Sequence, residues 1–245
     1  GSLRIDNRIF MPAMHLNMCR NFEVTENLIE FYKRRSEGGA GLISTGYATV
    51  DELSGNGGNI GAHDDRFLPG LTGLAEAIHS GGAKAAMQLN HAGRYNHSAL
   101  LGGKTPIAPS PIASRLTGET PREMCEEDIA AVQQSFVMAA QRVVDAGFDV
   151  VEILAGTGYL ISEFLSPVTN NRTDGYGGTL TNRMRFGLEI VRSIRSQIGD
   201  VPILVRINGN DFMPGGNGRQ ELHHFGTALA EQGADALCVN VGWHE

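Results

Sequence analysis

Residues 126–154 read EEDIAAVQQSFVMAAQRVVDAGFDVVEIL, and the pattern of this segment predicts the fold class. Its first part, 126–146, has apolar residues at helical spacing, and Gly147 follows where a helix end favours the left-handed backbone conformation. Its second part, 149–154, is a short apolar run with the length of a buried strand. A helix that feeds directly into a buried strand is the repeating unit of a parallel α/β sheet.

The same helix-strand unit recurs along the whole chain. The segments predicted as strands are Arg8–Met11, Gly41–Thr45, Ala83–Leu89, Asp149–Leu154, Ile203–Ile207 and Ala236–Val241. The segments between them with helical spacing are Glu26–Glu37, Leu68–His79, Glu126–Ala146, Asn182–Ile198 and Gln220–Gln232. Glycines follow these helices where C-caps form, at Gly38-Gly39, Gly81-Gly82, Gly147, Gly199 and Gly233. This order predicts parallel strands joined by crossover helices.

The length of the chain indicates one domain. It has 245 residues, 41% hydrophobic and 19% charged, and a TIM (β/α)8-type barrel has about 250 residues. Such a barrel closes with eight strands, whereas about six strand-helix units are present here. We therefore expect residues 1–245 to form one TIM-barrel domain that is incomplete at its C-terminal end, with the last two units following Glu245 in a longer polypeptide. An open doubly wound sheet is the less favoured alternative, because no GxGxxG motif follows the first strand.

Charge and composition exclude several classes of partner. The net charge is −7 and the 20 basic residues are spread along the chain, which disfavours a nucleic-acid or membrane surface and favours a small-molecule substrate. Three separated cysteines, and the lack of a signal peptide or of an apolar run of about 18 residues, predict a cytoplasmic protein. No metal site is expected, because His223 and His224 are adjacent and diverge on a helix.

Five motifs carry a family resemblance. They are NRIFMPAMH (7–15), QLNHAGR (88–94), GYLISEFLSP (158–167), NRTDGYGG (171–178) and NRMRF (182–186). Together they resemble the FMN-binding barrel of the Old Yellow Enzyme family, and residues 158–159 with GWHE (242–245) are similar to its branch of 2,4-dienoyl-CoA and 2-enoate reductases. The resemblance implies FMN as cofactor, NAD(P)H as reductant, and a longer parent chain in which an iron-sulfur cluster and FAD follow this segment.

The resemblance also assigns one side of the flavin to the loop after the first strand. In the family pattern, main-chain groups of Ala13, Met14 and His15 lie against the O4 and N5 side of the ring, with Gly46 or Tyr47 beside them. A plain strand-to-helix loop is the alternative. Two further motif residues, His91 and Arg94, are expected to shape their own loop.

Two polar side chains on predicted strands suit the other side of the flavin. Gln88 offers both a donor and an acceptor, which fits the pyrimidine edge of the ring. Arg206 carries a permanent cation that stabilises the anionic reduced flavin near N1 and the C2 carbonyl. A buried ion pair of Arg206 with Glu152 or Asp211 is the alternative reading.

The reduction of an activated double bond also needs a proton donor and a group that holds the carbonyl. Many family members place a histidine pair after the fourth strand, but residues 154–159 contain no histidine. The resemblance to dienoyl-CoA reductases instead implies Tyr159 and His244 as the catalytic acids, and a phenol with a pKa near 10 keeps its proton at neutral pH. The alternatives are a packing tyrosine and a histidine that frays at the end of the segment.

The sequence thus predicts an FMN-dependent oxidoreductase that reduces the C=C bond of an enoate or an enoyl or dienoyl thioester with NAD(P)H. An amine dehydrogenase on the same scaffold is the nearest alternative, although one Trp and five Tyr provide few residues for an aromatic cage. The other alternative is a non-catalytic truncated barrel, whose exposed strand edges favour a homo-oligomer or pairing with a missing C-terminal segment. Residues 171–176 are expected to form a structural hydrogen-bonded turn.

Overall fold

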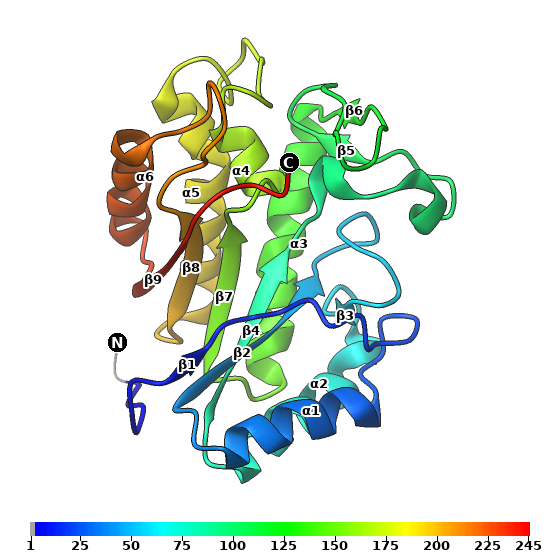
Figure 1. Ribbon diagram of the computed structural model, residues 1–245, viewed down its shortest axis with the longest axis vertical. Helices are drawn as coiled ribbons and strands as arrows, with labels where there is room; N and C mark the ends of the chain where they lie inside the picture. The colour runs from blue at the N-terminus through cyan, green and yellow to red at the C-terminus, as the bar shows by residue number, and fades with distance from the viewer. Residues whose placement is uncertain (1–2) are drawn as a thin grey trace.

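Parallel strands form one curled sheet in the computed structural model, which describes residues 3–245 (Figure 1). Hydrogen-bonded neighbours follow the order β1-β2-β4-β7-β8-β9, and β3 pairs with the end of β2. The strands are β1 (Phe10–Met11), β2 (Leu42–Thr49), β3 (Ile60–Gly61), β4 (Lys84–Asn90), β7 (Val150–Ala155), β8 (Ile203–Asn208) and β9 (Ala236–Asn240). A second, two-stranded sheet consists of β5 (Ile107–Ala108) and β6 (Arg122–Glu123).

Helices connect consecutive strands and cover the outer face of the sheet (Figure 1). They are α1 (Glu26–Glu37), α2 (Leu68–Ser80), α3 (Glu126–Asp145), α4 (Leu160–Leu165), α5 (Leu180–Ile198) and α6 (Arg219–Glu231), and short 3-10 turns follow at Asp65–Phe67, Gly93–Tyr95 and Ser98–Leu101. The predicted glycines end the long helices, with positive φ at Gly39, Gly82, Gly147, Gly199 and Gly233. No helix within residues 3–245 is long and apolar enough to cross a lipid bilayer.

Alternation along the strands separates two environments. On β7, Val151 and Ile153 belong to the core between sheet and helices, whereas Val150 belongs to a smaller apolar cluster on the inner face. Because successive side chains point to opposite faces, Glu152 lies above Val150 on that inner face. The same step on β8 places Arg206 above Leu204. The inner face is therefore apolar at the amino ends of the strands and polar toward their carboxyl ends.

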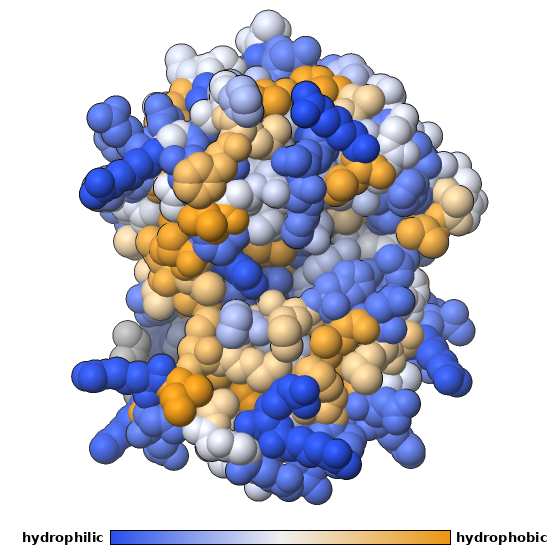
Figure 2. Space-filling model, viewed as in Figure 1, coloured by the Kyte–Doolittle hydropathy of each residue, from blue (hydrophilic) through white to orange (hydrophobic). Residues whose placement is uncertain are grey.

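The sheet is not closed. Within the described residues β1 and β9 are the two ends of the strand order and do not pair with each other. Val239 and Val241, on and beyond β9, are 62% and 63% exposed, and Figure 2 shows apolar surface over this edge. The chain is a partial TIM barrel of six parallel main strands, as predicted, and the doubly wound alternative is wrong.

Three local predictions differ from the structure. β2 continues to Thr49 beyond the predicted end at Thr45, because its ladder with β4 shifts register at Gly46 and then resumes. The helix α4 was not predicted, since a single turn with six buried residues has no amphipathic period. The pair β5 and β6 is likewise too short for an alternation pattern.

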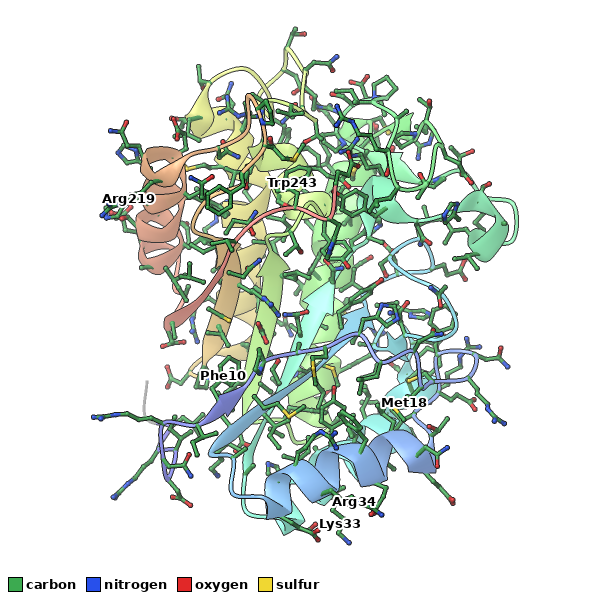
Figure 3. The ribbon with its side chains drawn as sticks, in the orientation of Figure 1. Phe10, Met18, Lys33, Arg34, Arg219 and Trp243 are labelled. Atoms are coloured by element: carbon green, nitrogen blue, oxygen red, sulfur yellow. The ribbon has the colours of Figure 1, made fainter. Side chains whose placement is uncertain are left out.

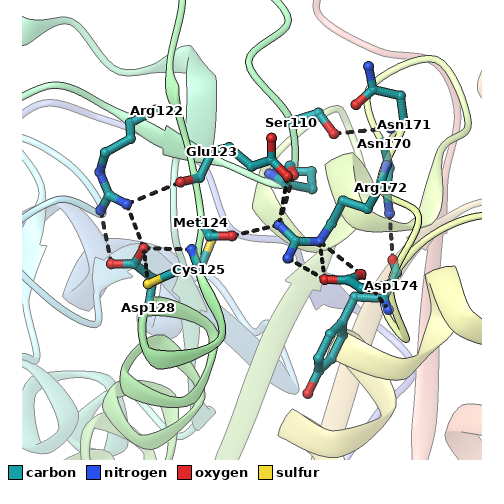
Figure 4. A network of polar contacts seen from close by, with 12 residues as sticks. Ser110, Arg122, Glu123, Met124, Cys125, Asp128, Asn170, Asn171, Arg172 and Asp174 are labelled. Carbon is teal, nitrogen blue, oxygen red and sulfur yellow. Dashed lines mark hydrogen bonds and ion pairs between the residues drawn. The ribbon is translucent and has the colours of Figure 1, made fainter.

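The loop that carries Arg172 is a hydrogen-bonded structural turn, as predicted (Figure 4). The Arg172 guanidinium donates to the carbonyl oxygens of Pro109 and Met124 and pairs with the carboxylate of Asp174. These bonds connect the loop after α4 to the segment that enters α3. The guanidinium beside Asp174 lowers the pKa of that carboxyl. This part of the molecule is therefore scaffold.

Candidate active site

Gln88 and Arg206 lie on one wall of the inner face. Gln88 stands opposite Glu152 in the β4–β7 ladder, and its Nε2 donates to Glu152 Oε1 at 3.0 Å. Arg206 Nη1 donates to the carbonyl oxygen of Ala13 at 3.2 Å, and its buried Nε has no partner among the described residues. Within residues 3–245, Arg206 forms no ion pair with Glu152 or Asp211, although its charge opposes the rise in the pKa of Glu152 that burial causes. Asp211 instead accepts a hydrogen bond from Asn208 Nδ2 at 2.8 Å.

The loop after β1 crosses this wall beside the bulge of β2. The Ala13 carbonyl is the contact with Arg206 described above, while Met14, His15, Gly46 and Tyr47 line one small pocket. The His15 and Tyr47 rings meet edge to face with centroids 5.3 Å apart. The structure thus brings together all of the residues that the family resemblance assigned to the cofactor.

The free polar atoms of this wall fit the flavin ring system. Arg206 retains unpartnered N–H groups, including a buried Nε, that suit an electron-rich N1 and C2 carbonyl edge. No described residue donates to Gln88 Oε1, which leaves an acceptor for the N3–H of a pyrimidine edge. Gln88, Arg206 and the main chain at Ala13 would therefore hold the isoalloxazine ring of FMN.

Three aromatic rings pack around Tyr159, at the start of α4. The centroid of Tyr159 lies 5.7 Å from Tyr47, 5.7 Å from Tyr95 and 5.3 Å from His244. Tyr95 also contacts His244 at 5.8 Å, so Tyr95, Tyr159 and His244 form a triangle of rings. Three of the five tyrosines, Tyr47, Tyr95 and Tyr159, thus converge at this point.

The environment sets the protonation state of both predicted acids. Burial raises the pKa of Tyr159, and the positive charge of Arg206 opposes this shift. Burial, assisted by the same charge, lowers the pKa of His244 below 6.5. At neutral pH, Tyr159 is therefore a protonated phenol and His244 is a neutral imidazole that donates through one ring nitrogen.

The segment that carries His244 is anchored rather than frayed. Glu245 accepts from Arg94 Nη2 at 2.9 Å, and both side chains are only 3% exposed. Glu245 also accepts from the Ser114 hydroxyl at 3.2 Å. Trp243 forms an isolated parallel bridge with Thr157, and Figure 3 places it near the carboxyl ends of the strands. Arg94 therefore fixes the position of residues 243–245, which include His244, in addition to the loop-shaping role expected for it.

Sequence reasoning missed two residues of the site. Tyr95 directly follows the motif that ends at Arg94, but only the fold brings it against Tyr159. Glu152 had a signal, since it is the single charged residue in an apolar strand. From the sequence, Glu152 is expected only as an ion-pair partner of Arg206. No group of three or more metal-binding side chains occurs in the described part of the chain.

Gly158 is the glycine on which the aromatic cluster depends. A Cβ at this position would lie 2.2 Å from Tyr95 Oη and 2.7 Å from Trp243 Cε3. We expect Gly158→Ala to displace both rings and to reduce turnover by about 10²-fold, the size expected for a misplacement of about 1 Å. Steady-state kinetics with an activated alkene measures the effect.

Gly147→Ala is the matched control for that substitution. Gly147 has φ of +90° against +91° for Gly158, so both alanines meet similar backbone strain, but no atom lies within 4 Å of a Cβ at 147. Thermal unfolding should show a loss of stability for both variants, and only Gly158→Ala should lose activity. Equal activity losses would mean that strain, and not displacement, is responsible.

The charge of Arg206 should be detectable in the titration of His244. The pKa of His244 lies below 6.5, so the ring is neutral above pH 6.5 and becomes protonated only as the pH falls further. Arg206→Met removes one of the two causes, and the pKa of His244 should rise. NMR of the imidazole Cε1–H resonances measures it, and His63, whose pKa is lowered mainly by burial without any contribution from Arg206, should not change. An unchanged His244 would contradict the proximity of these groups.

Comparison of the sequence with known protein families identifies a matching family. The profile of the NADH:flavin oxidoreductase / NADH oxidase family matches residues 1–243. The chain is 53% identical to a metal reductase of Desulforamulus reducens and 41% identical to an NADH oxidase of Thermoanaerobacter brockii. All of the chain is covered in both cases, but only 37% and 38% of those relatives. The chain thus spans less than two fifths of their length.

Comparison with solved structures agrees with this family match. A complex of 2-naphthoyl-CoA reductase with 2-naphthoyl-CoA superposes with a TM-score of 0.94 and 35% identity, over 98% of this chain and 39% of that one. The family profile covers all but the last two residues of the sequence, so it includes Gln88, Tyr159 and Arg206. The chain belongs to the NADH:flavin oxidoreductase / NADH oxidase family, the Old Yellow Enzyme family that its motifs resemble.

Proposed function

We propose that this protein reduces the C=C bond of an enoate, or of an enoyl or dienoyl thioester, with FMN as cofactor and NAD(P)H as reductant. The observation that supports it most is the position of Tyr159 and His244 in ring contact, close enough to Arg206 for its charge to shift both of their pKa values. The neighbour named 2-naphthoyl-CoA reductase also acts on an acyl thioester. Its name favours a thioester as the carbonyl that activates the alkene.

The net reaction consumes NAD(P)H and one proton and converts C=C to CH–CH. FMN, when bound, supplies the hydride that originates from NAD(P)H. Tyr159 gives its phenolic proton to the other alkene carbon and regains a proton from solvent. His244 donates a hydrogen bond to the carbonyl oxygen and stabilises the negative charge that develops there.

Anaerobic half-reactions test the proposal. The protein is loaded with FMN and reduced with NADH or NADPH, and is then mixed with crotonate or crotonyl-CoA. Return of the oxidised flavin absorbance, together with formation of the saturated product, is the expected result. Reoxidation by oxygen alone, with no reduced product from any enoate or thioester, would rule out this function.

Metal-ion reduction is the second candidate, because the relative at 53% identity is named a metal reductase. Electron transfer to a ferric chelate requires no proton donor at a carbon atom. Ferric citrate should therefore reoxidise wild-type protein and Tyr159→Phe at the same rate if this is the activity. An alkene reductase shows the opposite pattern, with Tyr159→Phe impaired toward the alkene only.

The remaining alternatives have their own signatures. The rings that converge around Tyr159 support an amine dehydrogenase more than the small number of aromatic residues in the sequence suggests. Reduction of the flavin by trimethylamine in the absence of NAD(P)H would identify this activity. A non-catalytic barrel fragment would not bind FMN and would associate through its open edges, which size-exclusion mass measures. We also propose, from the resemblance, that an iron-sulfur cluster and FAD belong to a longer parent chain.

A further inference from the structure

We propose that Glu152 is a positioning residue, which fixes the amide of Gln88 so that its Oε1 faces the cofactor site and accepts the N3–H of the flavin. The inference rests on the proposed FMN site. It assigns a role to the one charged side chain of β7, which the mechanism above does not use.

The contacts of Glu152 define a short chain of hydrogen bonds across three strands. Its Oε1 accepts from Gln88 Nε2 at 3.0 Å, and its Oε2 accepts from the hydroxyl of Ser44 on β2. Glu152 and Ser44 are fully buried and Gln88 is 3% exposed. Each carboxylate oxygen thus has one donor, and both donors are protein groups.

The ionised form of Glu152 permits only one orientation of the amide. Burial raises the pKa of Glu152, while the hydrogen bonds from Ser44 and Gln88 and the charge of Arg206 oppose that shift and favour the carboxylate. A carboxylate only accepts hydrogen bonds, whereas an amide has a donating nitrogen and an accepting oxygen. If the Gln88 amide turned over, its oxygen would face Glu152 Oε1, and two acceptors would meet inside the protein. The nitrogen therefore stays against Glu152, and Oε1 is the atom that remains without a donor among the described residues.

Stability alone does not account for the carboxylate. Burial of a carboxylate is unfavourable unless it is well paired, and Glu152 forms no ion pair within 4 Å among the described residues, although the charge of Arg206 opposes the rise in its pKa that burial causes. An apolar residue would fit the pattern of the strand, in which the other five residues are Val, Ile, Leu and Ala. The carboxylate is thus a costly feature of the fold, and its contact with Gln88 supplies a reason for it.

The pyrimidine edge of a flavin requires that orientation. Along the edge, the C2 carbonyl and the C4 carbonyl accept hydrogen bonds, and N3–H between them is the single donor. Arg206 offers donors, including its buried Nε, so it matches a carbonyl of this edge. Only an acceptor satisfies N3–H, and Gln88 Oε1 is that acceptor when Glu152 holds the nitrogen.

A double-mutant cycle on FMN affinity tests this inference without turnover. Dissociation constants are measured by flavin fluorescence quenching for wild type, Glu152→Met, Gln88→Ala and the double variant. One lost hydrogen bond corresponds to about fivefold to tenfold weaker binding, and we expect this for each single variant. Because Glu152 acts through Gln88, the double variant should bind no more weakly than Gln88→Ala. Additive losses would overturn the inference.

A modified ligand tests the same contact from the other side. The probe 3-methyl-FMN has no hydrogen on N3, so wild type should bind it about fivefold to tenfold more weakly than FMN. Glu152→Met should bind both flavins equally. Glu152→Gln keeps the volume of the side chain but can present either its amide oxygen or its amide nitrogen to Gln88, so it no longer fixes the Gln88 amide. Its ratio of dissociation constants, 3-methyl-FMN over FMN, should be less than half of the wild-type ratio. The full wild-type ratio in either variant would overturn the inference.

Glu163→Met is the control for replacement of a buried glutamate by methionine. Glu163 is also fully buried and accepts from the main-chain N–H of Arg94 at 2.9 Å, away from Gln88. Its FMN affinity should equal that of wild type. If the protein binds FMN but the effects of the Glu152 and Gln88 substitutions on affinity are additive, only this inference is overturned. If the two effects are coupled but no alkene is reduced, only the proposed function is overturned. No FMN binding by wild type overturns both.

Discussion

Tyr159→Phe is expected to slow reoxidation of the reduced protein by an activated alkene by about 10²-fold to 10⁴-fold, the range for loss of a general acid. The substitution keeps the ring contacts with Tyr47, Tyr95 and His244 and removes only the hydroxyl. Reduction of the flavin by NAD(P)H needs no proton at a carbon atom, so its rate should be unchanged. Stopped-flow absorbance follows the two half-reactions separately.

Tyr176→Phe provides the matched control. This tyrosine donates to Glu189 at 2.9 Å in the turn of Arg172, and burial raises its pKa to about 12. Loss of its hydroxyl should leave both half-reactions near the wild-type rates. If Tyr159→Phe also behaves like wild type, the proton comes from another group, and Tyr95 is the next to examine, because its buried hydroxyl has no hydrogen-bond partner in the described part of the chain.

Arg206→Met should lower the two-electron potential of the bound flavin by about 60–90 mV, which is the loss of about 2.7–4 kcal/mol of anion stabilisation expressed as a potential. The reason is electrostatic: the proposed site places the guanidinium beside the flavin, where it would stabilise the anionic reduced form more than the neutral oxidised form. Its buried Nε, which has no partner within residues 3–245, is one of the donors that this substitution removes. Dye-coupled reductive titration measures the potential.

Arg142→Met separates the local charge from the net charge. Arg142, on α3, pairs with Asp65 and donates to the carbonyl oxygen of Ala62, outside the barrel interior. Both substitutions remove one positive charge from a chain of net charge −7. Only Arg206→Met should shift the potential, and equal shifts would show that the effect is not specific to the position of Arg206.

Much of the fold could be predicted because long amphipathic helices and apolar strands have clear periods. The prediction of α1 matches the observed residues, and the long helices and β4, β7 and β8 differ from prediction by one or two residues at their ends. The missed α4 is a single turn whose burial comes from its neighbours, and its sequence has no period to detect. Such segments are set by tertiary packing.

The candidate site could be predicted where it depends on strand ends, and not where it depends on loops. Gln88 and Arg206 follow from the positions of two strands, because side chains near the carboxyl ends of parallel strands share one rim. The bond between Arg94 and Glu245 joins residues that lie 151 positions apart in the sequence, on two irregular segments. No local pattern indicates this pair, or the contact of Tyr95 with Tyr159.

The alternation of β7 between two environments also constrains how this gene can vary in length. Because Val150 and Glu152 face inward and Val151 and Ile153 face the helices, loss of a single codon within the strand would exchange the two sets. A carboxylate would then enter the apolar layer beneath the helices, and an aliphatic side chain would stand opposite Gln88. Homologues should therefore gain and lose residues in the connecting loops while the strands keep their length.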